Sequence, residues 1–323
     1  MPSGFGMSAA HQREGSAKGL EHLAAGFDGL CRDQHKGDDA RLRPAVDPIV
    51  DRAPLDDDIA SLQMRDIARL ELHVDLALHN DGIIERVCPV DARRVAEETE
   101  SLRGKGLDVR GEVLDVTDHV ALDKAIDSAA AAYGRLDVVF ANAGIDSGPG
   151  FLGSWVGSVR PRRTEGALEN YTDERWNRVI DINLNGAFAV LRAAARHMKP
   201  RKSGRMIVTT SLAALLVEPA IGSAYMAAKA GLAHLARSVA LELAAYNITV
   251  NSIAPGFFIT NIGGGHAKNP EVQRTLAQTI PMHRVGFAED IKGLALFLAS
   301  PASAYITGQQ IVIDGGWGLG AAD

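Results

Sequence analysis

A tyrosine and a lysine stand four residues apart, at Tyr225 and Lys229, in a stretch whose apolar spacing predicts a helix. Residues four apart share one helix face, so the phenol and the ammonium can point into the same cleft. A free tyrosine has a pKa of about 10, and a nearby cation favours the phenolate. The pair could therefore act as a general acid–base, although the same spacing also fits a surface pair. None of the other four tyrosines is followed by lysine at this distance.

Further polar and small residues follow apolar, strand-like runs. Ser211 ends the run RMIVTTS, where its hydroxyl could reach a carbonyl oxygen. ANAG closes another run at residues 141–144, and PGFFIT closes a third at 255–260. Asn183 lies inside a predicted helix, where asparagine is a poor helix former unless its amide has a partner. If the strands are parallel, their carboxyl ends meet at one edge of the sheet and can form one ligand site.

The elements that would position these residues alternate in type from Asp91 onward. Helical spacing covers residues 91–106, 118–134, 173–198, 223–246 and 289–300, and short apolar runs cover 107–116, 136–144, 205–211, 248–256 and 309–316. Such alternation implies right-handed crossovers and a parallel sheet covered by helices on both faces. We therefore predict an α/β, doubly wound fold in a single domain that binds its ligands at the carboxyl ends of the strands.

The first part of the chain has a different character. Residues 1–58 show no sustained periodicity, and the stretch RLRPAVDPIVDRAPLDDD contains three prolines. This composition predicts an irregular, disordered or loosely attached extension. Residues 59–82 regain helical spacing and are expected to form a helix, with a short strand at 87–90. The predicted domain therefore covers residues 59–323.

Composition excludes several classes of function. The apolar fraction of 46% suits a soluble globular protein, and the net charge of −6 gives no footprint for nucleic acid. Two cysteines, Cys31 and Cys88, are too few for a disulfide framework, and the ten histidines show no metal-ligand spacing such as HExxH. We therefore expect no metal site. Because no apolar run reaches membrane-spanning length and no signal-peptide core is present, we expect a cytoplasmic protein.

Taken together, these motifs resemble those of the short-chain dehydrogenase/reductase family, of the type that includes the β-ketoacyl carrier-protein reductases and gluconate dehydrogenases. The matching segments are LDVTD at 114–118, ANAG at 141–144, INLNG at 182–186, TTSLA at 209–213, YMAAK at 225–229, NSIAPGFFIT at 251–260 and TGQQIVIDGG at 307–316. The resemblance implies a Rossmann-like fold and an enzyme that interconverts a ketone and a secondary alcohol with NAD or NADP.

The resemblance also implies roles for single residues. Tyr225 would be the acid–base, and Lys229 would be its pKa partner and a ligand of the nicotinamide ribose. Ser211 would hold the carbonyl oxygen, and Asn183 would organise a water for proton relay. The cofactor would be bound by Asp115 and Val116 at the adenine, by Asn142, Ala143 and Gly144 along its length, and by Pro255, Gly256, Phe258 and Thr260 near the nicotinamide. A small-molecule substrate and a homo-oligomer, either a tetramer or a dimer, are implied as well.

One expected motif is missing. The first βα turn of the family carries a TGxxxGxG loop, whose glycines let the cofactor pyrophosphate approach backbone N–H groups at a helix N-terminus. It should precede Asp91 by some thirty residues, yet no glycine occurs from Asp38 to Asp81. The series GPGFLG at 148–153 matches GxGxxG but follows the wrong strand. Pro89 takes the place of the acid that selects the ribose, so the sequence does not reveal a preference between NAD and NADP.

Two explanations of the missing loop stay open. Residues 1–87 could build the first βα unit without glycines, or the reading frame could have shifted upstream of Val87. The alternative to an active enzyme is a relative that is non-catalytic or impaired in cofactor binding, acting as a scaffold or arising as a frame-disrupted product. A long loop between Ile145 and Asp173 carries Arg160, Arg162 and Arg163. These arginines could contact an acidic substrate, but a solvated insertion is the favoured interpretation.

Overall fold

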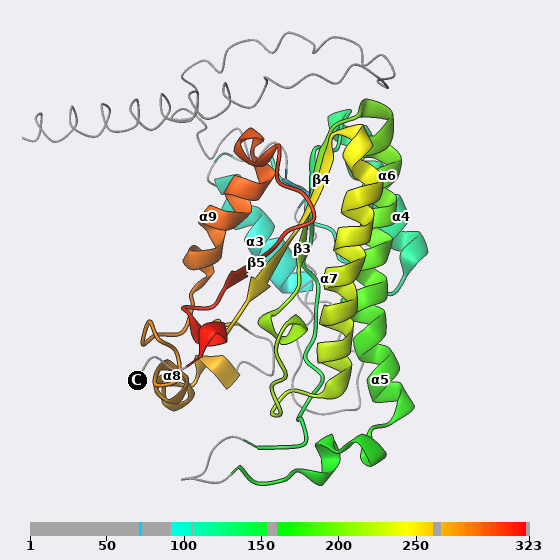
Figure 1. The fold of residues 1–323 in the computed structure, drawn as a ribbon. Coiled ribbons are helices and arrows are strands. Elements are labelled where there is room, and N and C mark those ends of the chain that lie inside the picture. Colours follow the sequence, from blue (N-terminus) through cyan, green and yellow to red (C-terminus); the bar gives the residue numbers. More distant parts are fainter. Residues whose placement is uncertain are drawn as a thin grey trace, which may run out of the picture. The chain divides into compact units, whose positions relative to one another are not determined.

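The sheet at the centre of the structure is parallel, and its strands lie side by side in their order along the chain (Figure 1). The strands are β1 (Glu71–Leu72), β2 (Val138–Ala141), β3 (Gly204–Thr209), β4 (Ile248–Pro255) and β5 (Gln310–Ile313). The computed structural model describes residues 71–72, 92–104, 106, 108–153, 160–260 and 266–320. All of these residues belong to one compact unit of the chain, Asp57–Asp323.

Helices connect and cover the strands. They are α3 (Ala92–Gly104), α4 (His119–Tyr133), α5 (Asp173–Ile180), α6 (Ala187–Arg201), α7 (Ser223–Leu243), α8 (Pro270–Ala277) and α9 (Ala288–Ala299). A π-helical segment, Asp181–Gly186, joins α5 to α6, and short 3₁₀ helices occur at Thr164–Gly166, Leu168–Asn170, Leu212–Ala214, Ala244–Tyr246, His266–Lys268, Pro301–Ser303 and Trp317–Leu319. None of the helices in this described part of the chain has the length and apolar character needed to cross a membrane.

Side chains of the strands alternate between two apolar layers, as the period of a strand requires. On one face, Val139, Met206 and Val250 pack with α4, α6 and α7. On the opposite face, Val138, Ile207 and Ile253 pack with Leu298 of α9. Figure 1 shows the same two layers, with α4, α6 and α7 on one side of the sheet and α9 on the other. The predicted doubly wound α/β fold is therefore confirmed.

Local signals explain where the helices begin and end. Asp118 caps α4 by accepting hydrogen bonds from the N–H groups of Val120 and Ala121, and Gly134 ends the helix in the left-handed conformation. Asn269 caps α8 in the same way, and Pro270 occupies its first position. This last helix, between β4 and α9, did not appear among the sequence predictions, because its eight residues carry only a short apolar pattern.

The predicted strand at 107–116 is wrong. The described residues 108–115 have irregular backbone without strand pairing. Val116 is buried and Leu114 packs against the core, but residues 111–113 are exposed. An alternating apolar pattern becomes a strand only where a neighbouring backbone accepts its hydrogen bonds, and no described strand lies beside this segment.

The predicted helix at 59–82 is also wrong where it is described. Glu71 and Leu72 form β1, which pairs in parallel with Val138 and Val139 of β2. Tertiary pairing with β2 therefore overrides the helical spacing at these residues. The remainder of that helix, the short strand at 87–90 and the extension at 1–58 lie outside the described residues, and the domain boundary at residue 59 stays a prediction.

Candidate active site

The loops that leave β2, β3 and β4 carry most of the residues singled out from the sequence. Asn142 follows β2, Ser211 follows β3, and Gly256 follows β4. Tyr225 and Lys229 lie in the first turns of α7, which packs on the face of β3 and β4. Parallel strands place these carboxyl ends at one edge, so residues more than a hundred positions apart meet there.

The Ser211 hydroxyl lies near the Tyr225 hydroxyl and influences its pKa as a hydrogen-bond donor. Ser211 is held in extended backbone at the start of a 3₁₀ turn, where its Oγ accepts from the Ala213 N–H at 3.1 Å. Burial raises the pKa of Tyr225 above its usual range, the hydrogen bond from Ser211 opposes the rise, and the negative charge of Asp146 adds to it. The phenol is therefore in its protonated, donating form at neutral pH.

Lys229 is buried beneath this pair. Its Nζ donates to the main-chain oxygen of Thr209 at 2.9 Å and lies 5.6 Å from the centre of the Tyr225 ring. Burial lowers the pKa of Lys229 to about 8. The sequence predicted that the lysine would lower the pKa of the tyrosine, but in the structure burial dominates and the pKa of Tyr225 is raised.

Asn183 is completely buried in the π-helical segment between α5 and α6. Its Nδ2 donates to the main-chain oxygens of Ile145 at 3.0 Å and Val179 at 3.1 Å. Its Oδ1 has no hydrogen-bond partner in the described part of the chain. A buried amide oxygen without a donor is costly, so this atom fits a bound water or ligand hydroxyl. The partners also explain why an asparagine occupies this helical position.

Gly144 packs against Asn183 and Lys229. A Cβ at this position would lie 2.8 Å from Asn183 Oδ1 and 3.3 Å from Lys229 Nζ. Only glycine leaves room for the carboxamide and the ammonium to approach the loop after β2. The motif ANAG therefore has a steric role that places Asn183 and Lys229 on the same side of the loop.

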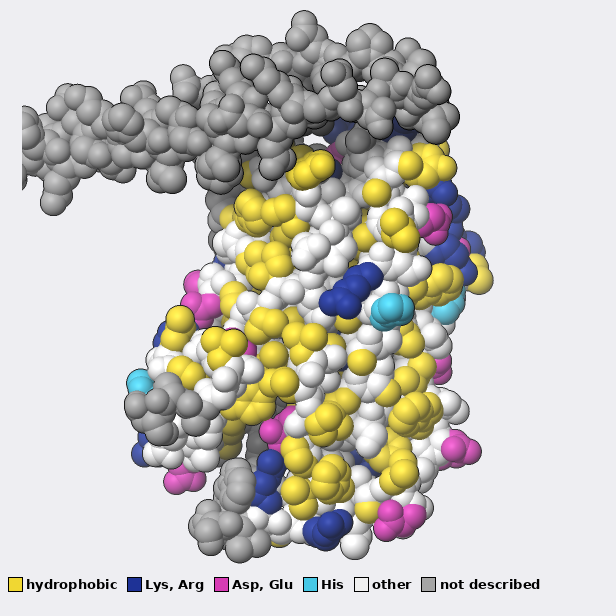
Figure 2. Space-filling model, viewed as in Figure 1, with side chains coloured by type: hydrophobic (Ala, Val, Ile, Leu, Met, Phe, Trp, Pro, Cys, Tyr) yellow, Lys and Arg dark blue, Asp and Glu magenta, His cyan; other side chains and the backbone are white. Residues whose placement is uncertain are grey.

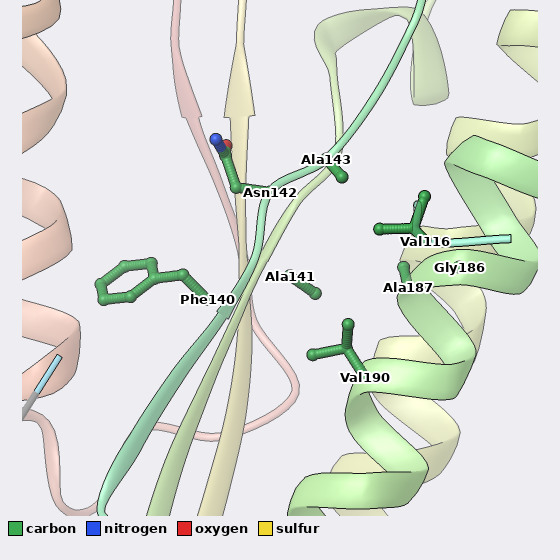
Figure 3. A pocket seen from close by; sticks show the side chains of 8 residues that line it. All are labelled: Val116, Phe140, Ala141, Asn142, Ala143, Gly186, Ala187 and Val190. Atoms are coloured by element: carbon green, nitrogen blue, oxygen red, sulfur yellow. The ribbon is translucent and has the colours of Figure 1, made fainter. Parts of the chain in front are cut away.

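A small hollow lies between the end of β2 and the start of α6 (Figure 3). Ala141 and Ala143 line it from the end of β2 and the loop after it, and Val116 faces them from across the hollow, whereas the Asn142 side chain points away (Figure 3). The Asn142 Oδ1 accepts a hydrogen bond from the Thr209 hydroxyl at 2.7 Å. Gly186 completes the wall, since a Cβ there would lie 3.0 Å from Val116. The hollow is lined mainly by apolar side chains.

Asp115 and the segment after β4 have structural contacts within the protein. Asp115 Oδ1 accepts from the N–H and the hydroxyl of Thr117, so it builds the turn before α4. Pro255 ends β4, and Gly256 allows close approach of Asp314, whose Cβ would lie 2.6 Å from a Cβ at residue 256. Phe258 packs its ring against Gly286, and Thr260 is exposed. The Phe258 side chain is therefore used in packing.

Comparison with known proteins agrees with this geometry. The family described as enoyl-(acyl carrier protein) reductase matches residues 76–318. The sorbose reductase of Candida albicans is 32% identical over 213 residues, which is 66% of this chain and 70% of that protein. A 3-oxoacyl-(acyl-carrier-protein) reductase of Mycobacterium avium is 35% identical over 237 residues, covering 71% and 84% of the two chains. The chain belongs to the short-chain dehydrogenase/reductase family.

A solved structure of the same family supports the assignment. The gluconate 5-dehydrogenase of Burkholderia cenocepacia, in complex with NADP and tartrate, has a TM-score of 0.61 and 30% identity, with 71% of this chain and 83% of that chain covered. As a short-chain dehydrogenase/reductase, the chain is an NAD(P)-dependent oxidoreductase. The family match begins at residue 76, so residues 1–75 lie outside it.

The insertion of this short-chain dehydrogenase/reductase, between residues 145 and 173, packs onto the loop that precedes α7. Gly150 N donates to Ala220 O at 2.9 Å, and Leu152 N donates to Pro219 O at 3.1 Å. Gly150 of the GPGFLG series serves this packing, because a Cβ there would lie 2.2 Å from Pro219 O. Gly148 lies against Arg175, and Gly153 lies against Pro161 and Arg163.

The interpretation of the insertion as solvated is wrong for Arg160 and is confirmed for Arg162 and Arg163. The Arg160 guanidinium pairs with the Glu218 carboxylate at 2.5 Å, with side chains only 16% and 17% exposed. Arg162 and Arg163 are exposed. Arg160 is therefore paired with an acidic residue of the protein itself and not with the acidic substrate considered above.

Two residues near Tyr225 are not among those singled out from the sequence. Asp146 follows the ANAG motif and acts on Tyr225 through its charge. Arg175 of α5 donates to the main-chain oxygens of Ser147, Glu165 and Pro149. The position of Asp146 directly after a strand-end motif was the available signal. Arg175 carried none, because its partners are backbone atoms of a distant loop. Within the described residues, no three His, Cys, Asp or Glu side chains gather to hold a metal ion.

Proposed function

We propose that this chain interconverts a ketone and a secondary alcohol, with Tyr225 as the general acid–base. The observation that carries the proposal is that the Lys229 ammonium nitrogen lies 5.6 Å from the centre of the Tyr225 ring, with the Ser211 hydroxyl near the phenol. Two hydroxyls that meet at the carboxyl edge of the sheet can hold one carbonyl oxygen between them. The nicotinamide, when bound, supplies or accepts the hydride.

Tyr225 donates its proton to the carbonyl oxygen during reduction and takes it back during alcohol oxidation. Its raised pKa keeps the proton available as an acid at neutral pH. Ser211 positions the same oxygen, since its Oγ is already fixed by the Ala213 N–H. The positions of these two groups are set by β3 and α7, which are rigid elements of the core.

Lys229 and Asn183 would return the proton to Tyr225. Lys229 uses one of its three N–H donors on Thr209 O and keeps the others for a ribose hydroxyl or a water. Asn183 Oδ1 could accept from that water, because it has no other partner in the described residues. Asn142, Ala143 and Gly144 line the side of the loop where the cofactor would lie, and Val116 would contact the adenine.

A second candidate is a relative that binds the cofactor weakly or not at all. The specific observation in its favour is the absence of glycine between Asp38 and Asp81, where the family's phosphate loop is expected. The catalytic residues would then be assembled without a bound nicotinamide. The two candidates share a fold and differ in one measurable quantity, the affinity for NAD(P)H.

That quantity is tested by titrating the full-length protein with NADH and with NADPH while following nicotinamide fluorescence. Saturable binding, with ketone reduction that is lost in Tyr225→Phe, supports the dehydrogenase and reveals the preferred cofactor. A folded protein that binds neither would overturn the proposed activity and favour the second candidate. Intact-mass analysis of the native protein separately tests whether residues 1–87 are translated as given.

Assembly into a homo-oligomer, a dimer or a tetramer, is part of the proposal. Large apolar side chains are exposed on the helical layer, including Trp176 of α5, Phe188 of α6 and Leu241 of α7. Figure 2 shows apolar side chains spread over one face of the molecule. A second copy could cover them. Light scattering coupled to gel filtration would determine the mass in solution, and cell fractionation would test the expected cytoplasmic location.

A further inference from the structure

The loop after β2 brings a carboxylate, Asp146, to the start of α7. Ser147 anchors this loop, because its Oγ donates to Gly222 O at 3.1 Å and its own main-chain oxygen accepts from Arg175 Nε at 2.6 Å. Gly222 is the residue before α7, and its main-chain oxygen accepts from Tyr225 N at 3.1 Å. The residue next to Asp146 is therefore tied to the same turn that holds the acid–base.

The Asp146 carboxylate is half-buried and has no cationic partner within 4 Å among the described residues. Its Oδ1 accepts from Gly148 N at 2.6 Å, which forms a turn within the loop. The nearby cation Arg175 donates to three main-chain oxygens. Lys229 donates to Thr209 O instead. Within the part of the chain that the structure describes, the negative charge of Asp146 is thus not neutralised by an ion pair.

The groups that face this loop come from two elements. Tyr225 and Lys229 face it from α7, and Arg175 faces it from α5, with the Tyr171 hydroxyl donating to Ser147 O at 3.3 Å. Asp146 is the chain neighbour of Ser147, whose Oγ donates to Gly222 O, and the same Gly222 O accepts from Tyr225 N, so the carboxylate is carried beside the turn that holds the phenol. In this position its negative charge contributes to the raised pKa of Tyr225. A substrate whose oxygen bonds to Tyr225 would bring its neighbouring atoms into the same field.

We infer that Asp146 selects substrates by charge, disfavouring ketones that carry an anionic group and favouring neutral hydroxyl-bearing or cationic ones. This inference rests on the proposed function. An unpaired carboxylate repels a second carboxylate in a partly desolvated site and accepts hydrogen bonds from hydroxyl or ammonium groups. Discrimination against the wrong substrate then comes from a repulsive group built into the site.

Asp146→Asn separates the charge from the turn, because the asparagine oxygen can still accept from Gly148 N. Each probe pair has a neutral ketone and a matched anion, namely L-sorbose with 5-keto-D-gluconate and methyl levulinate with levulinate. We expect Asp146→Asn to raise kcat/KM for the anion relative to the neutral ketone by on the order of tenfold, as one partly screened charge implies. Glu169→Gln, at an exposed carboxylate of the same insertion, should leave the ratio unchanged. An unchanged ratio in Asp146→Asn would overturn the inference.

A second measurement distinguishes failure of this inference from failure of the proposed function. Ionisation of Tyr225 is followed by tyrosinate absorbance, as the difference between each protein and its Tyr225→Phe form. Asp146→Asn should ionise at lower pH than the wild type. If this shift is seen but the wild type reduces none of the ketones, the proposed hydride transfer is wrong. The inference about substrate selection, which rests on it, is then wrong as well. If ketones are reduced and neither the ratio nor the ionisation changes, Asp146 alone is wrongly assigned.

Discussion

The ammonium nitrogen of Lys229 lies 5.6 Å from the centre of the Tyr225 ring, one helical turn along α7. The same nitrogen donates to Thr209 O at 2.9 Å, at the end of β3. Helix α7 is therefore fixed to the carboxyl edge of the sheet by a charged hydrogen bond, and the phenol is held in front of Ser211. The relationship connects a spacing in the sequence to the position of the Tyr225 phenol in space.

Replacing Tyr225 by phenylalanine should abolish proton transfer and leave the fold intact. The ring stays in place, and only the hydroxyl that contacts Ser211 is removed. We expect kcat to fall by about 10²–10⁴-fold, the usual contribution of a general acid–base, with cofactor affinity almost unchanged. Steady-state kinetics and NAD(P)H titration measure the two quantities. A variant that retains most of its turnover would remove Tyr225 from the mechanism.

Lys229 should make stability depend on pH above neutrality. Its pKa falls from 10.5 to about 8 in the folded protein, so between these values the unfolded chain binds more protons. Stability therefore rises as pH increases from 8 to 10.5, because the cost of the buried charge, about 3 kcal/mol, is progressively removed. Below pH 8 this contribution is constant. Urea unfolding of wild type and Lys229→Met between pH 7 and pH 10 measures it. A difference in unfolding free energy that does not rise with pH would contradict the prediction.

Asn183→Ala should lower the free energy of unfolding as well as the catalytic rate. The change leaves the buried main-chain oxygens of Ile145 and Val179 without the donor they have now. An unsatisfied buried acceptor costs about 1–3 kcal/mol. Asn185→Ala is the matched control in the same π-helical segment, since its amide contacts only the Asp181 carboxylate, at the surface. Its expected cost is below about 0.5 kcal/mol in the same urea experiment. Equal costs would mean that the Asn183 amide has no special structural role.

Gly144→Ala should lower the activity, whereas Gly293→Ala should raise the stability. A Cβ at Gly144 would displace Asn183 Oδ1 and Lys229 Nζ, so we expect activity to fall by at least about tenfold. Gly293 lies exposed in α9 with nothing within 4 Å of a Cβ, and alanine there should stabilise the helix by about 0.5–1 kcal/mol. Kinetics and thermal unfolding of both variants measure the contrast. Full activity in Gly144→Ala would show that the loop can shift without effect.

The ion pair of Arg160 and Glu218 should be coupled energetically. Both side chains are mostly buried, so alanine at either one leaves the other charge poorly solvated. Each single substitution should cost about 1–3 kcal/mol, and the double substitution should cost less than the sum of the two. A double-mutant cycle by urea unfolding measures the coupling. Additive losses would place the pair in the class of surface ion pairs, which contribute little.

Several parts of this protein follow from the sequence because they depend on local spacing. Tyr225 and Lys229 share a helix face whatever surrounds them, and the run that ends at Ser211 is a strand in the structure. The alternation of helices and apolar runs predicted the doubly wound sheet, because each buried layer imposes its own period. The family resemblance rested on the same short motifs.

Other parts depend on which distant segments come together. No local pattern reveals that Glu71 and Leu72 pair with β2, or that none of the described strands lies beside residues 108–115. The pairing of Arg160 with Glu218, the contact of the Asn183 amide with Ile145 O and the effect of Asp146 on Tyr225 all cross tens of residues. Local spacing sets which side chains can share a face. The tertiary structure decides what each face meets, because hydrogen bonds, burial and charge act between atoms that are close in space.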